Sequence, residues 1–163
     1  IIYSFNNQIR FNSEGLFNIP VGKRDFNSST KKNIKNFCLK VSNLDCSFLC
    51  SDFRNVNTAG FRSPFLYCDP PYFLGIAAYN ENDGWTEKDE RDLLAFLLNE
   101  SQKGHQFALS NVIEHKGKKH TMLIEWALEN GFNVIHLKSS YRNSNYQLKD
   151  KKADTDEVLI TNY

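Results

Sequence analysis

The sequence predicts an open α/β sheet, mostly parallel, that ends in an antiparallel hairpin. Between residues 65 and 137, apolar strand-like runs alternate with amphipathic helix-like runs, an order typical of parallel strands joined by helices. Only polar residues separate the apolar run 132–137 from the last one, 157–163. Without a helix between them, these two strands are expected to form an antiparallel hairpin at the edge of the sheet.

The first third of the chain carries weaker signals. Residues 1–24 have Asn-rich, Gly-containing loop chemistry, and residues 25–40 suggest a polar loop with a short helix that starts near Ser28. The run 44–50, Leu-Asp-Cys-Ser-Phe-Leu-Cys, predicts a strand. Residues 51–53, Ser-Asp-Phe, are expected to end that strand, and a short helix or turn follows.

Two helices are predicted in the rest of the chain. The first begins after Thr86, a good N-cap residue followed by acidic residues, and extends to about Gly104. The second spans 118–130 and ends at Asn130-Gly131. The inward faces are expected to carry Leu93, Leu94, Phe96, Leu97 and Leu98 in the first helix and Met122, Leu123, Trp126, Ala127 and Leu128 in the second. Strands are expected at 65–68 and 106–110.

Polar residues stand where three of the predicted strands end. Asp52, Asp69 and Asn111 each end or directly follow such a strand. Ligands of open α/β sheets bind at the carboxyl ends of the strands. We therefore expect these three side chains to line one edge of the sheet.

The most informative run is 65–72, Phe-Leu-Tyr-Cys-Asp-Pro-Pro-Tyr. Four apolar or aromatic residues predict a buried strand, and the two prolines, which lack a backbone N–H and have a fixed φ, must end it at Asp69. The result is a stiff elbow that holds a carboxylate, carbonyl groups and the ring of Tyr72 close together.

This elbow suits a planar base that carries an exocyclic amine. Asp69 can accept one N–H of the amine, the carbonyl of Pro70 can accept the other, and Tyr72 can stack on the ring. With both amino protons accepted, the nitrogen lone pair is free to attack a methyl donor, and no metal is needed. The alternative is a Pro-Pro turn at a strand end, with Asp69 as a capping residue.

Composition limits the function classes. A net charge of +1 argues against a surface that is basic overall, and a mean hydropathy of −0.52 without a long apolar run excludes a membrane span. Residues 23–40 are locally basic, with Lys23, Arg24, Lys31, Lys32, Lys35 and Lys40 against Asp25. Phosphate contact and a solvated lysine-rich loop explain this stretch equally well.

The cysteines and histidines predict neither disulfides nor a metal site. Cys38, Cys46, Cys50 and Cys68 form no Cys-x-x-Cys pair, and the four histidines complete no zinc pattern. Three of the cysteines lie in apolar, strand-like contexts. We interpret them as reduced, buried residues of a cytoplasmic protein.

The elbow resembles motif IV, the Asp-Pro-Pro-Tyr motif of amino-group DNA methyltransferases, and three further stretches narrow the resemblance. Residues 10–22, Arg-Phe-Asn-Ser-Glu-Gly-Leu-Phe-Asn-Ile-Pro-Val-Gly, look like the segment that precedes the catalytic motif in Dam-type (D12 class) DNA adenine N6-methyltransferases. Asp52-Phe53 looks like the Asp-Phe that ends the strand before it. Ser110-Asn111 and the closing run 157–163 follow the family's order, so the resemblance spans nearly the whole chain.

The resemblance implies roles for individual residues. In that family Asp69, Pro70, Pro71 and Tyr72 would hold the flipped target adenine as the catalytic group. Asp52, Phe53 and Asp69 would bind the cofactor, S-adenosylmethionine. The segment that contains Arg10, Asn12, Asn18, Lys23 and Arg24 would contact double-stranded DNA.

One family feature is missing. The cofactor loop of the family, an aromatic-Gly-x-Gly near the start of the protein, has no counterpart, because none of the eight glycines is separated from another by a single residue. We therefore expect a fragment of a longer enzyme whose amino-terminal part is a partner of this chain. Residues 1–40 would end the target-recognition region, and residues 41–163 would form the catalytic subdomain.

The resulting hypothesis is a DNA adenine N6-methyltransferase that is inactive as this fragment alone. The alternatives are methylation of an amino group in RNA or protein, and a non-catalytic remnant that binds nucleic acid.

Several residues keep a second interpretation. Asp52 fits an N-cap, Asn111 fits a loop residue, and Phe5, Phe11 and Phe17 fit core anchors as well as base-stacking groups. A solvated loop explains residues 141–143 and 149–152 better than phosphate contact does.

Overall fold

The chain folds as two units, residues 1–50 and residues 51–163. The computed structural model describes residues 9, 11–12, 14–22, 26–74, 84–137 and 155–163. The expectations for Phe5 and for the segments 141–143 and 149–152 lie outside these residues. Each unit is described by itself below.

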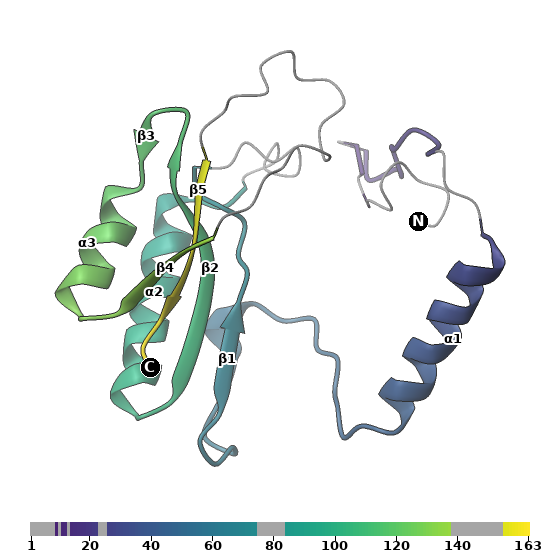
Figure 1. Cartoon of the computed structure of the whole chain (residues 1–163), viewed down its shortest axis with the longest axis horizontal. Helices are drawn as coiled ribbons and strands as arrows, with labels where there is room; N and C mark the ends of the chain where they lie inside the picture. The colour runs from purple at the N-terminus through teal and green to yellow at the C-terminus, as the bar shows by residue number, and fades with distance from the viewer. Residues whose placement is uncertain (1–8, 10, 13, 23–25, 75–83, 138–154) are drawn as a thin grey trace. The chain divides into compact units, whose positions relative to one another are not determined.

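The unit 51–163 is built on one sheet (Figure 1). Its strands are β1 (Phe65–Cys68), β2 (Gln106–His115), β3 (Lys118–Lys119), β4 (Asn133–Leu137) and β5 (Thr155–Thr161). The order is β1-β2-β5-β4, with β3 paired to β2. Strand β1 is parallel to β2, whereas β5 is antiparallel to both β2 and β4. Strands β1, β2 and β4 therefore share one direction.

This arrangement confirms the predicted α/β class and the antiparallel final hairpin. The hairpin lies at an edge of the described sheet, as expected, with β4 outermost. Strand β5 lies between β2 and β4 and pairs with β2 from Ala108 to His115. Insertion lets the apolar β5 residues become buried from both sides, as the zero exposure of Val158 and Ile160 shows.

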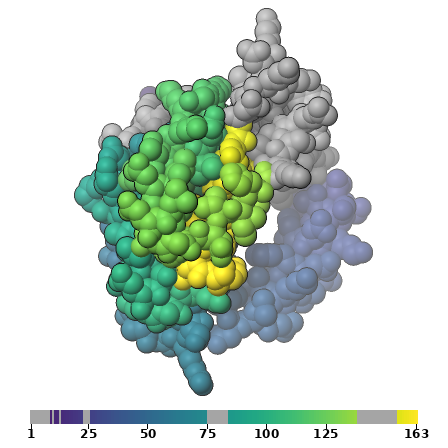
Figure 2. Space-filling view, turned by 60° about the vertical axis from the view of Figure 1, so that its left-hand side comes forward, coloured from purple at the N-terminus to yellow at the C-terminus, as the bar shows by residue number. Residues whose placement is uncertain are grey.

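Helices α2 (Glu87–Gln102) and α3 (Thr121–Glu129) pack on one face of the sheet. The sheet contributes alternate residues, which point to the same face of a strand. The buried cluster consists of Leu93, Leu94, Leu97, Leu123, Ala127, Phe107, Leu109, Val158 and Ile160. Figure 2 shows yellow atoms of the C-terminal segment between the green atoms of the α3 and β4 region. This core fixes α2 against β1 and β2.

Two expectations for the second helix of this unit are wrong. The second helix was expected from residue 118, but residues 118–119 form β3. The reason is the turn at Lys116-Gly117, where both φ angles are positive (50° and 75°), the geometry that returns a chain into a two-residue hairpin. Leu128, expected to point inward, is 71% exposed.

The other face of the sheet presents apolar side chains. Phe65 and Tyr67 in β1 and Ile135 and Leu137 in β4 are 39–63% exposed. These residues alternate with the inward-facing ones, so they lie on the face opposite α2 and α3. Strand β1 has one described neighbour, β2.

The unit 1–50 contains a turn and helix α1 (Ser28–Ser42). The Asn27 side chain caps α1 by accepting a hydrogen bond from the Thr30 N–H at 2.9 Å. The helix begins where the sequence predicted but is longer than the short helix expected. It has no buried residue.

The strand predicted at 44–50 is wrong, since these residues have no secondary structure. Leu44, Phe48 and Leu49 are 65–88% exposed. A strand needs a hydrogen-bonding neighbour, and the described residues supply none here.

The cysteine prediction is wrong in part. All four cysteines are free thiols, but Cys38, Cys46 and Cys50 are exposed, because α1 and the unpaired segment that follows it bury none of them. Cys68 is half-buried, and burial raises the pKa of its thiol. In the described part of the chain, no helix is both long and apolar enough to span a membrane.

Candidate functional site

The elbow follows β1 where the sequence predicts, but the expectation that this strand is buried is wrong, since Phe65 and Tyr67 are exposed and β1 has no buried residue. Strand β1 ends at Cys68, which pairs with Leu109, and β2 continues for six residues beyond that point. Asp69 is exposed, and Pro70 and Pro71 are half-buried. The carboxylate therefore stands at the carboxyl end of β1, where parallel strands present ligand sites.

Tyr72 is held against β2. Its hydroxyl lies 3.1 Å from Ser110 Oγ. Burial raises the pKa of the phenol, the Ser110 hydrogen bond opposes that shift, and the negative charge of Asp69 adds to it. The net effect keeps Tyr72 in its neutral form, so its ring presents an uncharged face beside the carboxylate.

Asp52 and Phe53 form a short turn, η2 (Phe53–Asn55), at the amino end of α2. Asp52 is the N-cap residue, and its Oδ1 accepts from the Arg54 N–H at 2.8 Å, as the alternative interpretation expected. Its carboxylate also binds the Arg54 guanidinium at 3.0 Å and remains 48% exposed. The capping role leaves half of this carboxylate accessible to a ligand.

Arg54 ties this turn to α2. It contacts Asp89 Oδ1 at 2.6 Å and Asp92 Oδ2 at 2.8 Å, and these two hydrogen bonds raise the pKa of the guanidinium despite some desolvation. Asp89 has a lowered carboxyl pKa because Thr86 donates to it, through its side chain and its backbone, and then because Arg54 does. The guanidinium also lies 4.5 Å from the centre of the Phe53 ring.

Phe53 packs on aromatic residues at the start of α2. Its ring centre is 5.8 Å from that of Trp85 and 6.2 Å from that of Phe96. Because α2 connects β1 to β2, its first turn lies at the carboxyl end of β1, the end that carries Asp69. The turn at Asp52 and the elbow at Asp69 are thus both attached to the amino end of α2.

Asn111 does not line the edge as expected. It lies inside β2, which is longer than predicted, and its side chain is fully buried. Its Nδ2 donates to Glu90 Oε1 at 3.0 Å, and its Oδ1 accepts from the Val112 N–H. Asn111 therefore lies within the sheet and contacts the carboxylate of Glu90, and it does not line the ligand-binding edge.

The residues predicted to bind DNA all fall within residues 1–50, and the structure describes two of them. Asn18 is exposed and Asn12 is half-buried, whereas the structure does not describe Arg10, Lys23 and Arg24. The lysines of α1 (Lys31, Lys32, Lys35 and Lys40) are all exposed, and no acidic residue occurs in that helix. Four lysines of the basic stretch thus lie in α1, a helix that has no acidic residue.

Asn12 has a local structural role. Its Oδ1 accepts from the N–H groups of Glu14 and Leu16 at 3.0 and 2.9 Å, and Gly15 has a φ of +75°. The turn brings Phe11 and Phe17 together as an antiparallel bridge with rings 6.1 Å apart. Both rings are about half exposed, so they form a surface pair.

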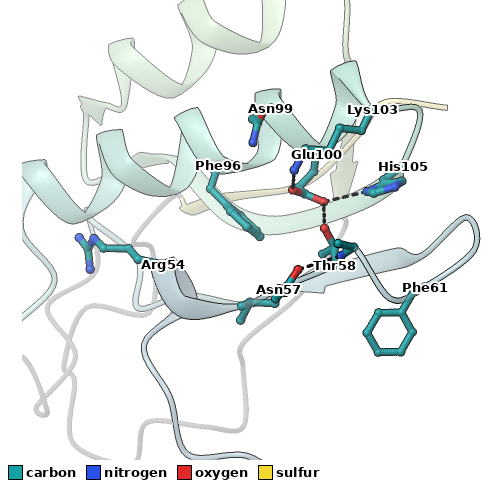
Figure 3. A pocket seen from close by; sticks show the side chains of 11 residues that line it. Arg54, Asn57, Thr58, Phe61, Phe96, Asn99, Glu100, Lys103 and His105 are labelled. Atoms are coloured by element: carbon teal, nitrogen blue, oxygen red, sulfur yellow. Dashed lines mark hydrogen bonds and ion pairs between the residues drawn. The ribbon is translucent and has the colours of Figure 1, made fainter.

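A cleft of about 430 Å³ runs along α2 from Arg54 and Phe96 to its carboxyl end, where Glu100 lies (Figure 3). Glu100, only 2% exposed, accepts from Thr58 Oγ1, Lys103 Nζ and His105 Nδ1 at 2.6–2.8 Å. Burial favours a higher pKa for this carboxyl, but the three hydrogen bonds outweigh it and lower the pKa to about 2. The elbow residues 69–72 do not line this cleft.

Comparison with known proteins identifies the family. The model of the D12 class N6 adenine-specific DNA methyltransferases matches residues 2–143. The chain belongs to this family. It is 38% identical over 99% of its length to modification methylase StsI from Streptococcus sanguinis, of which it covers 25%. It is 36% identical over its whole length to type II methyltransferase M.FokI from Planomicrobium okeanokoites, of which it covers 26%.

A more distant relative is the retron Ec67 DNA adenine methylase from Escherichia coli, 31% identical over 67% of the chain. The chain spans about a quarter of the length of the first two relatives. Family membership agrees with the prediction made from the elbow and from residues 10–22.

Sequence reasoning missed the side chains beneath the elbow. Trp85, Glu90 and His120 join Asn111 in one hydrogen-bonded group. The available signal for Glu90 is its position three residues before Leu93, which places it on the inward face of the helix. Within the described ranges, no group of three or more His, Cys, Asp or Glu side chains is arranged to hold a metal ion.

Proposed function

We propose that this chain carries the amine-binding part of an enzyme that transfers a methyl group from S-adenosylmethionine to N6 of adenine in double-stranded DNA. The observation that carries the proposal is the exposed carboxylate of Asp69 at a strand end, beside a Tyr72 ring fixed to Ser110 at 3.1 Å. A family match over residues 2–143 supports the same chemistry.

The residues act by holding the amine. Asp69 accepts one N–H and the carbonyl of Pro70 accepts the second, so the N6 lone pair points out of the base plane. The nitrogen forms a bond to the methyl carbon as the carbon–sulfur bond breaks, and the amine then loses one proton to Asp69 or solvent. Tyr72 stacks on the base, and Pro71 keeps the elbow stiff. Orientation and a fixed negative charge account for most of the rate.

The residues present fit one side of a cofactor site. The half-exposed carboxylate of Asp52 can accept an adenine amino group, and the Phe53 ring beside it offers an apolar surface. S-Adenosylmethionine would supply the methyl group. Asp69, as an anion at the same end of α2, would favour the positive sulfonium centre.

A further part of the same enzyme is the proposed partner. The chain lacks a Gly-x-Gly loop and covers about a quarter of StsI and M.FokI. Phe65 and Tyr67 of β1 expose apolar surface of the kind that a further strand or helix would bury. Isothermal titration of S-adenosylmethionine into this chain alone should therefore show no binding or very weak binding, and clear binding would contradict the need for this partner.

DNA contact is proposed for the unit 1–50. Its candidates are Arg10, Asn12, Asn18, Lys23 and Arg24, together with the exposed lysines of α1. A helix without acidic residues next to such a segment suits a phosphate backbone. The cytoplasmic location remains a prediction.

The test is Asp69→Ala in the complete gene product that contains this chain. Incubation with S-adenosylmethionine labelled in its methyl group and unmethylated genomic DNA should yield N6-methyladenine with the wild type. The variant should lose activity by at least about a hundredfold to a thousandfold, with an unchanged thermal midpoint because Asp69 is exposed.

Asp45→Ala provides the control, since Asp45 is an exposed acid of the unit 1–50 and should leave activity unchanged. Retained activity in Asp69→Ala would overturn the proposal. Label in added RNA or protein, but not in DNA, would support amino-group methylation of a different substrate. DNA binding without methyl transfer would support a non-catalytic remnant.

A further inference from the structure

Glu90 lies at the centre of a buried polar group beneath the elbow. It is 0% exposed. Its Oε1 contacts Asn111 Nδ2 and His120 Nε2, each at 3.0 Å, and its Oε2 accepts from Trp85 Nε1 at 2.5 Å. Both carboxylate oxygens are therefore engaged within the protein.

The direction of each hydrogen bond follows from the partners. The Trp85 indole and the Asn111 amide nitrogen can only donate. His120 caps α3 by accepting from the Leu123 N–H at its Nδ1, 3.4 Å away, so its proton is on Nε2 and points at Glu90. Glu90 consequently accepts three hydrogen bonds from neutral donors.

One of these donors contacts a residue of the proposed site, and the other two lie next to it. The Trp85 ring packs on Phe53 at 5.8 Å, on the proposed cofactor side. His120 packs against Phe73, the residue after Tyr72, at 5.2 Å. Asn111 directly follows Ser110, the partner of the Tyr72 hydroxyl.

We infer that Glu90 is a positioning residue for methyl transfer. It fixes the elbow that holds the base relative to the Asp52–Phe53 turn, the proposed cofactor side. The elbow is otherwise attached to the sheet through β1 and Ser110, and the Asp52–Phe53 turn through α2. A single carboxylate with three donors restrains both. This inference rests on the proposed function, because it assigns a purpose to the same site.

Glu90→Gln is the discriminating change. The amide has the shape of the acid but only one acceptor atom. Whichever way it turns, its NH₂ group faces an N–H donor, and Asn111 cannot turn without losing its bond to the Val112 N–H. The side chains should shift by fractions of an ångström, without loss of the fold.

Glu100→Gln is the matched control. Glu100 lies on the same helix, is 2% exposed and also accepts from three donors, but it contacts no residue of the proposed site. Both variants replace a buried carboxylate of α2 by its amide. A general loss of stability would therefore affect them alike.

In the complete gene product, methyl transfer to unmethylated genomic DNA should separate the two variants. Glu90→Gln should lower kcat by about tenfold to a hundredfold, with the KM for DNA within about threefold. Glu100→Gln should leave kcat within about twofold, because it alters no group at the site. Thermal unfolding of both proteins accompanies the kinetics.

A kcat for Glu90→Gln equal to that of the wild type, or an equal loss in Glu100→Gln, would overturn the inference. Inactive wild-type enzyme would instead overturn the proposed function. If Glu90→Gln does not fold, Trp85→Phe decides: it keeps an aromatic ring at the position beside Phe53, although a smaller one, and removes the N–H that donates to Glu90. The KM for S-adenosylmethionine should then rise by about threefold to tenfold, and an unchanged KM would contradict the inference.

Discussion

Helix α2 buries one glutamate near each end, and the two have different surroundings. Glu90, near the amino end, accepts from Trp85, Asn111 and His120, whose neighbours belong to the proposed site. Glu100, ten residues later, accepts from Thr58, Lys103 and His105 beside a cleft that the elbow does not line. Residue type, burial and the number of donors are the same.

The comparison shows that burial of a carboxylate does not by itself indicate a role in function. Whether such a carboxylate affects function depends on which residues its hydrogen-bond donors contact. At the amino end of α2 the donors reach the elbow and the Phe53 turn, whereas at the carboxyl end they fasten the segment around Thr58 and the turn into β2. We expect the first end to control activity and the second to control stability.

The largest expected effect is on stability, from a substitution in the core that α2 shares along its length. Leu97 is 0% exposed and lies on α2 between the two glutamates. Leu97→Ala should lower the free energy of unfolding by about 2–5 kcal/mol, because it leaves a cavity in the shared core. Urea unfolding measures the change, with Leu128→Ala, at a side chain 71% exposed, as a control within about 0.5 kcal/mol. Equal effects of the two changes would contradict the assigned core.

Acid should affect the carboxyl end of α2. The pKa of Glu100 is lowered from its ordinary value of 4.5 to about 2 in the folded protein. Its stabilisation is therefore complete above about pH 4.5 and is lost as the pH falls through about 2, at most ~3 kcal/mol. Urea unfolding between pH 6 and pH 2 should show a shallower decline for Glu100→Gln than for the wild type. Parallel pH profiles would show that Glu100 does not contribute this pH-dependent part of the free energy of unfolding.

The capping box at the amino end sharpens the comparison. Thr86 Oγ1 accepts from the Asp89 N–H at 3.2 Å, and Asp89 Oδ2 accepts from the Thr86 N–H at 2.9 Å. Thr86→Ala should cost about 1 kcal/mol of stability, while Thr86→Ser should restore most of it. Denaturant unfolding measures both, and equal losses in the two variants would show that the hydroxyl does not act as a cap.

The smallest effect is expected at the tyrosine hydroxyl. Tyr72→Phe keeps the ring and removes the 3.1 Å contact with Ser110, so kcat for methyl transfer should fall only about threefold to tenfold. Tyr67→Phe, at an exposed residue of β1, should leave kcat unchanged. A loss in Tyr72→Phe as large as that of Asp69→Ala would mean that the hydroxyl, rather than the ring, does the essential work.

Local sequence signals predicted the elements whose stabilising contacts lie close in the chain. The strand at 65–68 and its termination by two prolines, the Thr86 cap and the helix that was expected to reach about Gly104 and ends at Gln102 all follow from neighbouring residues. The run 44–50 has equally strong strand propensity but no described pairing partner, so the same kind of signal failed there. Strand formation depends on a second segment, which local sequence does not contain.

The family, the carboxylate–proline–aromatic elbow and the alternation of strands and helices after residue 65 follow from the amino-acid sequence. The insertion of β5 between β2 and β4, the burial of Asn111 and the hydrogen-bonded group around Glu90 do not. These features depend on residues that are far apart along the chain: the partners of Glu90 at positions 111 and 120 come from β2 and α3. Packing of α2 against the sheet brings them together, and no local pattern records that contact.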